Sequence, residues 1–334
     1  MSGGPWLPIT SARTLRACAE FPARADDVFV CSYPKSGTTW CQNLVARILT
    51  RSRGDEPTTD TWSHVSQVSP FFEIDPHWDH GAESSSLAAH VIENHRRFAR
   101  GRRVFNTHLP LTLMPRVRDE TPGGKGKNTG RLPKIVYVAR DGRDCAVSFW
   151  RHLKSQSVED GGWQGGWDAF FDAWIEGSIA FGSWFDHLLS WRDAPAVWFG
   201  APEAFALKKE EEKKYSYVRD HPVLAVRYED MKTDLRGVAR AVAAHVDPSR
   251  PMCDHEIDEI VRACTFEAMK DDIEKYQPIS VRWTDETFSF VNRGVVGSFE
   301  DVFSDEQKTR FEEKAKAKLG TKTFGKHCQS RECS

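Results

Sequence analysis

Three segments of the chain repeat one layout: a short apolar run rich in β-branched residues, a polar loop, and a stretch with helical spacing of apolar residues. They are DDVFVCSYPKSGTTWCQNLVARIL, LPKIVYVARDGRDCAVSFWRHL and HPVLAVRYEDMKTDLRGVARAVAAHV, and RRVFNTHLP supplies another strand-like run. Strands that alternate with helices form parallel sheets covered on both faces, and ligands bind beyond the carboxyl ends of such strands. We therefore expect one α/β domain over residues 1–334, with a central parallel sheet flanked by helices.

Composition narrows the class of protein. The 334 residues are 40% hydrophobic, which is enough for one sizeable core. No segment approaches the ~20 apolar residues that span a bilayer, and the first residues lack the apolar run of a signal peptide. Lys and Arg total 46 against 48 Asp and Glu, so the formal charge of −2 gives no reason to expect a nucleic acid or membrane surface as partner. We expect a cytoplasmic protein with reduced thiols, because its cysteines form no dense disulfide framework.

The first of the three loops, YPKSGTTW at residues 33–40, joins a strand pattern at 28–32 to a helical pattern at 40–49. It points at a helix N-terminus, where unpaired backbone N–H groups and the helix dipole favour an anion. Gly37 lets the backbone approach a ligand closely, and Lys35 adds a full positive charge. A plain turn capped by Ser and Thr would explain the hydroxyls but not the lysine. An ATP-type P-loop needs Gly-x-x-x-x-Gly-Lys-Ser/Thr, which neither this loop nor GGKGKNTG at 123–130 fits.

The order of motifs along the chain resembles the cytosolic sulfotransferase family. YPKSGTTW is similar to the family's 5′-phosphosulfate loop, and five matches follow in the expected order: NTHLP at 106–110, VYVARDGRDCAVSFW at 136–150, GSWFDHLLSW at 182–191, VRYEDMKTD at 226–234 and NRGVVGSF at 292–299. The resemblance covers about residues 29–303. It implies a single domain with the P-loop-kinase-like, three-layer sulfotransferase fold. It also implies 3′-phosphoadenosine 5′-phosphosulfate (PAPS) as sulfuryl donor, with no metal.

The resemblance assigns side chains to the donor by position. Around the 5′-phosphosulfate and the adenine it places Lys35, Ser36, Gly37, Thr38, Thr39, Trp40, Tyr228, Thr265 and Phe266. Arg140 and Ser148 resemble the pair that holds the 3′-phosphate, and Arg293 and Gly294 resemble the end of an Arg-Lys-Gly clamp over it. Asn292 departs from the first position of that clamp. The alternatives are an exposed Arg140 paired with Asp141 or Asp144, and a Tyr228 that only fills the core.

His108 matches the family's general base. An imidazole that titrates near neutrality can take the proton that an attacking hydroxyl loses. Asn106 stands where animal enzymes of the family often have a lysine. For the acceptor pocket the corresponding segments offer five rings, those of Phe71, Phe72, Trp78, Phe149 and Trp150. Core packing is at least as good an explanation for any one ring, but together they favour a hydrophobic or aromatic acceptor.

The sequence thus predicts in-line transfer of a sulfuryl group from PAPS to a hydroxyl or amine of a small, largely apolar acceptor. Lys35 would neutralise the leaving phosphate, and adenosine 3′,5′-bisphosphate (PAP) would be released. One alternative is a nucleotide or small-molecule kinase on a related fold, although no carboxylate suited to Mg²⁺ adjoins the loop hydroxyls. Another is a non-enzymatic nucleotide-binding module. The tail HCQSREC at 327–333 offers too few ligands for a metal site, and the charged segment 205–217 is either a lid or solvated surface.

Many members of the family dimerise through Lys-x-x-x-Thr-Val-x-x-x-Glu, and the aligned residues here are Glu300, Ser304, Asp305 and Thr309. An acid in place of the leading lysine removes the charge complementarity that a short interface needs. We predict no dimer of that kind. Chemical cross-linking that mapped a two-fold contact to residues 300–309 would contradict this prediction.

Overall fold

The core of the fold is a five-stranded parallel sheet. The computed structural model describes residues 6–51, 61–81, 83–119, 121, 126–192, 194, 196–200, 221–285, 287–291 and 294–320. In the order β4-β1-β5-β7-β6, the sheet contains β4 (Val104–Thr107), β1 (Val28–Ser32), β5 (Lys134–Ala139), β7 (Val223–Arg227) and β6 (Ala196–Trp198). All four pairings are parallel. The predicted fold class, a central parallel sheet flanked by helices, is confirmed.

Side chains of the buried strands alternate between two hydrophobic clusters. In β1, Val28 and Val30 join one cluster, while Phe29 and Cys31 join the other. The alternation follows from the two-residue period of a strand. Because both faces are buried, the strands read as continuous apolar runs in the sequence, and this is why the sequence predicts them well.

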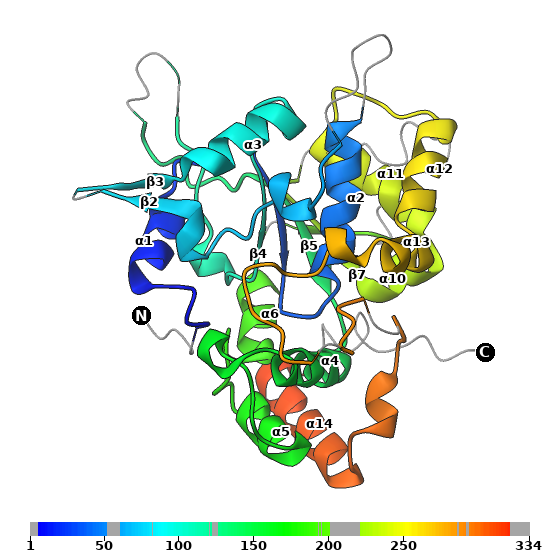
Figure 1. Cartoon of the computed structure of the whole chain (residues 1–334). Coiled ribbons are helices and arrows are strands. Elements are labelled where there is room, and N and C mark those ends of the chain that lie inside the picture. Colours follow the sequence, from blue (N-terminus) through cyan, green and yellow to red (C-terminus); the bar gives the residue numbers. More distant parts are fainter. Residues whose placement is uncertain are drawn as a thin grey trace.

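Helices cover the two faces of the sheet (Figure 1). On one face α2 (Thr38–Thr50) packs against α11 (Leu235–Val246) and α12 (Asp254–Ala263). On the other side, α4 (Gly142–Lys154) and α6 (Trp184–Arg192) join the second hydrophobic cluster, and α5 (Trp167–Ile175) and α14 (Asp305–Leu319) pack on them. The described residues also form the α-helices α1 (Ala12–Glu20), α3 (Ala89–Ala99), α10 (Tyr228–Thr233) and α13 (Phe266–Asp271), and β2 (Trp78–His80) pairs with β3 (Ser85–Leu87) in a small hairpin.

The last helix of the described residues, α14, is attached to α5 and α6. Phe311 is buried against Trp174 and Phe185, and this apolar contact supplies most of the attachment. Exposed ion pairs add little, as between Arg310 and Asp172 at 2.8 Å. Residues 300–309 are the segment through which we predict no dimer. There Ser304 caps α14, and Glu300 forms an ion pair with Lys308 at 2.7 Å. The lack of a dimer through this segment stays a prediction.

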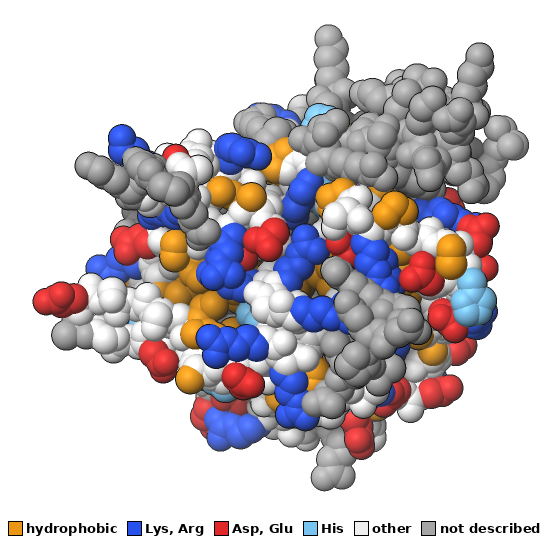
Figure 2. Space-filling model, turned by 90° about the horizontal axis from the view of Figure 1, so that it is seen from above, with side chains coloured by type: hydrophobic (Ala, Val, Ile, Leu, Met, Phe, Trp, Pro, Cys, Tyr) orange, Lys and Arg blue, Asp and Glu red, His pale blue; other side chains and the backbone are white. Residues whose placement is uncertain are grey.

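Charged residues gather at the amino ends of the strands. Figure 2 shows the molecule from above, with Lys and Arg side chains on this face and Asp and Glu side chains among them. Two arginines next to β4 are paired, Arg103 with Asp27 at 2.6 Å and Arg102 with Asp247 at 3.6 Å. These pairs fix the end of the sheet where the strands begin, and the candidate site lies at the other end. No helix in the described ranges is long and apolar enough to cross a membrane.

Several predicted segments can be located and others cannot. The strand patterns at 28–32 and within RRVFNT are β1 and β4. In the basic loop, Asn128 bridges Arg118, so residues 126–130 run alongside another loop and do not enter a helix. Arg293, Asn292, the segment 205–217 and the tail 327–333 lie outside the described residues.

Candidate active site

The loop between β1 and α2 has the backbone that an anion site needs. Lys35 and Gly37 have positive φ angles of 65° and 99°. Gly37 is the N-cap of α2 and gives it no side-chain cap, so N–H groups of the first turn are left for another partner. A Cβ on Gly37 would lie 2.7 Å from the Tyr228 ring, so only glycine fits without a shift. The sequence predicts that the backbone at Gly37 approaches a ligand closely. In the structure, the Tyr228 ring is a further reason why this position needs a glycine.

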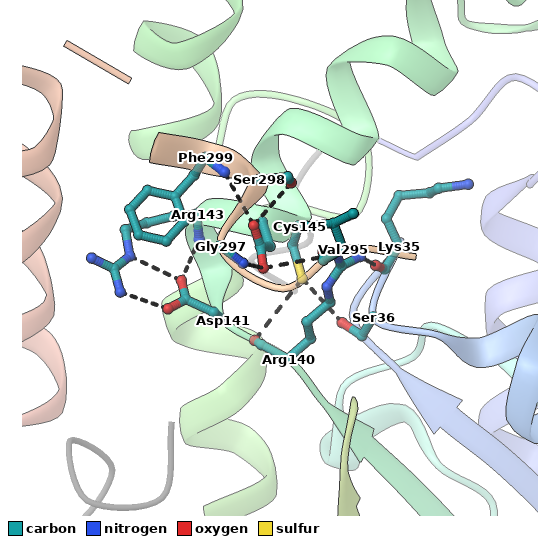
Figure 3. Close-up of polar contacts among 11 residues, drawn as sticks. Lys35, Ser36, Arg140, Asp141, Arg143, Cys145, Val295, Gly297, Ser298 and Phe299 are labelled. Atoms are coloured by element: carbon teal, nitrogen blue, oxygen red, sulfur yellow. Dashed lines mark hydrogen bonds and ion pairs between the residues drawn. The ribbon is translucent and has the colours of Figure 1, made fainter. Parts of the chain in front are cut away.

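Two hydroxyls of this loop face inward and support it. The Ser36 Oγ lies 3.3 Å from the Cys145 Sγ, and the Thr38 Oγ1 lies 2.5 Å from the Ser32 Oγ. Figure 3 shows the Ser36 side chain turned toward Cys145. Ser36 thus braces the loop against α4, and its hydroxyl does not line the cavity.

A cavity of about 320 Å³ lies at the carboxyl ends of the strands, where the loops after β1, β4, β5 and β7 meet. It is lined by thirteen of the predicted site residues: Lys35, Gly37, Thr38, Thr39, Trp40, Phe71, His108, Arg140, Ser148, Phe149, Tyr228, Phe266 and Gly294. Its size is within the range of small-molecule sites, roughly 300–1,000 Å³. Loops that are distant in the sequence therefore form one chamber.

Arg140 holds two of these segments together. Its guanidinium donates to the carbonyl oxygens of Lys35 at 3.0 Å and Val295 at 3.1 Å, and its Cζ lies 4.2 Å from the centre of the Tyr228 ring. It also lies 3.8 Å from a carboxylate oxygen of Asp144. Asp141 is bound to Arg143 instead, at 2.6 Å (Figure 3). Arg140 is therefore a buried, oriented cation and not an exposed surface arginine.

Asp144 fixes the C-terminal segment over the cavity. Its carboxylate is fully buried and accepts hydrogen bonds from the Gly297 N–H at 2.9 Å, the Ser298 hydroxyl at 3.0 Å and the Phe299 N–H at 3.2 Å. Sequence reasoning considered Asp144 only as a possible partner of Arg140. Its position four residues after Arg140, in the first turn of α4, is the signal that could have identified it.

Aromatic rings form the wall on the predicted adenine side. The rings of Trp40 and Tyr228 meet edge to face, with centroids 5.6 Å apart, and the Trp40 Nε1–H donates to the Cys264 carbonyl at 2.7 Å. Gly294 packs so closely that a Cβ there would lie 3.0 Å from the Phe266 ring. Thr265 does not line the cavity and instead caps α13 by accepting from the Ala268 N–H at 3.2 Å. Flat apolar walls of this kind suit a stacked base.

His108 is fixed in one tautomer. Its Nδ1 lies 2.8 Å from the Ser32 carbonyl oxygen, which can only accept, so Nδ1 carries the hydrogen and Nε2 keeps its lone pair. The rings of Phe71 and Phe181 flank the imidazole, with centroids 5.3 Å and 5.1 Å away. Burial, together with the charge of Lys35, lowers the pKa of His108 to about 4. At neutral pH the side chain is therefore an uncharged proton acceptor.

Three of the five rings expected in the acceptor pocket lie outside the cavity lining, and that part of the expectation is corrected. Phe72 and Trp78 pack on one another in the core, with ring centroids 5.3 Å apart, and Trp150 packs against Trp167 at 5.5 Å. The reason is local geometry. Phe71 bridges Asn106 in extended conformation, so its neighbour Phe72 points the opposite way, and Trp150 is turned about 100° from Phe149 on its helix.

Other residues on the cavity wall were not found by sequence reasoning. His152 lies one turn after Ser148 on α4, and its Nδ1 is 3.5 Å from the Lys35 ammonium. Phe290 lies under the same ammonium, 3.9 Å from Nζ to the ring centroid. The spacing of His152 from Ser148 was a usable signal, because residues four apart share a helix face. The sequence gives no such signal for Phe290, since this residue belongs to no helix or strand.

Comparison with known proteins assigns the family. The family model described as Sulfotransferase domain matches residues 25–198 and 209–323, so the chain belongs to the sulfotransferase family. It is 26% identical over 309 residues to sulfotransferase 1B1 of Mus musculus, covering 91% of this chain and 86% of the relative. It is 29% identical over 311 residues to sulfotransferase 1C2 of Rattus norvegicus, covering 90% and 85%. The predicted membership of the cytosolic sulfotransferase family, and with it an enzyme of this class, is confirmed.

Solved structures agree on the fold. A mouse sulfotransferase, SULT7A1, complexed with PAP superposes with a TM-score of 0.65 at 23% identity, covering 98% of this chain and 96% of that one. Retinol dehydratase in complex with retinol and PAP superposes with a TM-score of 0.61 at 23% identity, covering 97% and 89%. At these identities the likeness supports the fold alone.

The glycine at the start of α2 gives a test of the loop geometry. We expect Gly37→Ala to lower the free energy of unfolding by roughly 1–3 kcal/mol more than Gly101→Ala, because only the first change overpacks the site. Gly101 is a matched control: its φ is 80° and nothing lies within 4 Å of a Cβ there. Both variants carry the strain of a left-handed residue, roughly 1–2 kcal/mol. Equal losses in urea unfolding would show that the Tyr228 ring moves aside freely.

Proposed function

We propose that this protein transfers a sulfuryl group from PAPS to a hydroxyl or amine of a small, largely apolar acceptor in the cytoplasm. The observation that carries the proposal is a single cavity that contains both the Lys35 loop and an uncharged His108. Family membership supports the reaction class, and the two solved relatives that share its fold contain PAP. His108 acts as the general base, and no step requires a metal.

The donor would lie along the loop and the aromatic wall. Lys35, Thr39 and the first N–H groups of α2 are suited to the 5′-phosphosulfate, with Ser36 and Thr38 bracing the loop. Arg140 and Ser148 are suited to the 3′-phosphate, since both line the cavity beyond that loop. Gly294 would approach the donor from the segment that Asp144 fixes. Its neighbour Arg293 lies outside the described residues and stays a prediction for the same clamp.

The adenine would stack in the slot of Trp40, Tyr228 and Phe266. Thr265 contributes indirectly, because its cap sets where α13 and Phe266 begin. The acceptor would occupy the other end of the chamber, against Phe71, Phe149 and Phe181. These apolar rings favour a hydrophobic or aromatic molecule.

The chemical step then divides between two side chains. His108 Nε2 takes the proton of the attacking hydroxyl or amine as its oxygen or nitrogen forms the bond to sulfur. The bond between sulfur and the bridging phosphate oxygen breaks, and Lys35 balances the negative charge that grows on the leaving PAP. Asn106 lies on the same wall and donates through Nδ2 to the Gln42 Oε1 at 3.1 Å, so one cation fewer faces the transferring group than in relatives with lysine there.

A kinase is the main alternative, and the cavity argues against it. Mg²⁺ prefers carboxylate ligands, and no Asp or Glu belongs to the described part of the lining. A non-enzymatic nucleotide-binding module would have no use for a neutral imidazole beside the anion loop. The deciding experiment supplies ³⁵S-labelled PAPS with phenols, sterols, alcohols and amines, with and without Mg²⁺. Transfer that persists in EDTA supports the proposal, and ATP-dependent phosphorylation or binding without transfer would refute it.

Arg140→Ala tests whether Arg140 binds the 3′-phosphate of the donor. We expect binding of PAP to weaken by roughly 1.5–3 kcal/mol, the range of a charge-assisted bond, while adenosine 5′-phosphate loses far less. Calorimetric titration of both ligands against the same variant separates loss of one contact from collapse of the loop. Equal losses for the two ligands would show that Arg140 only supports the Lys35 and Val295 carbonyls.

His108→Ala tests the base. Donor binding should stay within about threefold while turnover falls by ~10² to 10⁴. Because burial lowers the pKa of His108 to about 4, the wild-type rate should hold as pH falls through 6.5 and decline only near that lower value. The exposed His255 supplies the control, and His255→Ala should change neither quantity. Single-turnover transfer under saturating donor makes the measurement, and a wild-type rate in His108→Ala would remove this residue from the mechanism.

A further inference from the structure

The Lys35 ammonium has a partner in the cavity that the proposed reaction does not use. Nζ lies 3.5 Å from the His152 Nδ1 and 3.9 Å from the centre of the Phe290 ring. An ammonium can only donate, so Nδ1 accepts and the hydrogen of the neutral imidazole is on Nε2. The distance is long for a hydrogen bond, so its attraction is mainly that of a charge for a lone pair and a π face.

The two strongest effects of the surroundings on Lys35 oppose its charge. Burial and the nearby Arg140 lower the pKa of Lys35 to about 7. The groups that face it offer no anion: burial raises the pKa of the Cys145 thiol to about 12 and lowers the pKa of His108 to about 4. No carboxylate belongs to the described lining. A small change in the contacts of this amine therefore decides whether it is charged at neutral pH.

His152 is held rigidly enough to serve as that contact. Burial, Lys35 and His108 keep the pKa of His152 well below its usual value, so the ring stays neutral and keeps an acceptor nitrogen. Its ring meets four others, those of Phe149, Trp283, Phe288 and Phe290. The segment that carries Trp283 is in turn bound to the end of α4, because the Ser157 N–H donates to the Arg282 carbonyl and the Thr284 N–H to the Ser155 carbonyl, each at 2.9 Å.

We propose that His152 is a positioning residue that favours the protonated form of Lys35 and directs its ammonium into the cavity, so that more of the empty loop is ready for an anionic donor at neutral pH. Figure 3 shows the Lys35 side chain extending away from Arg140, as expected if a partner on the cavity side draws it there. The identity of the donor rests on the proposed function. The protonation of Lys35 does not, and it can be measured without any ligand.

The first test measures the pKa of Lys35 in the unliganded protein, from the pH dependence of its acetylation by acetic anhydride, read by peptide mass spectrometry. His152→Phe keeps a flat ring and removes Nδ1, whereas His152→Asn supplies an amide oxygen near the same place. We expect the Phe variant to shift the acetylation midpoint down by about one pH unit, a tenfold change, and the Asn variant to stay near wild type. An unchanged midpoint in the Phe variant, or the same shift in both variants, would overturn the proposal.

Phe290→Leu provides a second variant that leaves His152 in place. It removes the π face under the ammonium, so its midpoint should fall less than that of His152→Phe. A larger fall would assign the effect to Phe290 and overturn the role of His152. If His152→Phe does not fold, as judged by circular dichroism, the comparison of His152→Asn with His152→Ala decides in the same way.

The second test titrates PAP at pH 6 and pH 8. We expect His152→Phe to bind within about twofold of wild type at pH 6 and about tenfold more weakly at pH 8, because the binding of an anion must then protonate the amine. His152→Asn should follow wild type at both values. Equal weakening at both pH values would show a purely steric role and overturn the proposal. A wild-type protein that does not bind PAP would instead refute the proposed function, and the acetylation result would still decide the role of His152.

Discussion

The arrangement of the site depends on the buried guanidinium of Arg140. It donates to the carbonyl of Lys35 in the β1–α2 loop and to that of Val295 in the C-terminal segment. These two carbonyls are far apart in the sequence, and Arg140 links the segments that carry them. A carbonyl is a weaker partner for a cation than a carboxylate, and the Asp144 carboxylate 3.8 Å away is largely occupied by three donors of residues 297–299. Arg140 is therefore oriented by the protein without being neutralised by it.

The incomplete neutralisation of Arg140 destabilises the empty cavity and favours the binding of an anion. Arg140 disfavours the charge of Lys35, and no carboxylate belongs to the lining formed by the described residues, so desolvation of the two cations destabilises the empty chamber. A ligand with several negative charges removes both penalties at once, so part of its affinity comes from relief of repulsion in the free protein. The site is in this sense shaped for a polyanion before any ligand contact is counted.

The sequence predicts the parts of the site that follow from regular periodicity. The strands are apolar on both faces, and the loops that follow parallel strands meet at one edge of the sheet. The sequence alone therefore places Lys35, His108 and Arg140 in one group. The adjacent rings Phe71 and Phe72 could not be separated in the same way, because their opposite directions depend on the bridge to Asn106.

The sequence also does not predict the contacts that side chains make with segments outside helices and strands. The wall to which residues 276–281 and 288–291 contribute has no hydrophobic period, and its position depends on the backbone hydrogen bonds that Arg282 and Thr284 make with residues 155–157. Without that wall the partners of His152 cannot be listed, although its helix face can be read from Ser148. Helix spacing therefore predicts which way a side chain faces, and tertiary pairing decides what it meets there.

The two side chains to which the proposed mechanism gives the chemical step, His108 and Lys35, are supported in opposite ways, and that mechanism explains the difference. His108 is held at Nδ1 by the Ser32 carbonyl and at its backbone N–H by Glu73, 2.6 Å away, a carboxyl whose pKa burial raises to about 8. Proton transfer from an attacking atom requires a base fixed within hydrogen-bond distance, so rigidity at this position favours the reaction. Lys35 instead carries its charge on a flexible stem from a strained loop residue, with only weak contacts at its tip. In the proposed mechanism negative charge grows on the leaving oxygen during transfer, and an ammonium on a flexible stem can adjust to that charge where a fixed guanidinium could not.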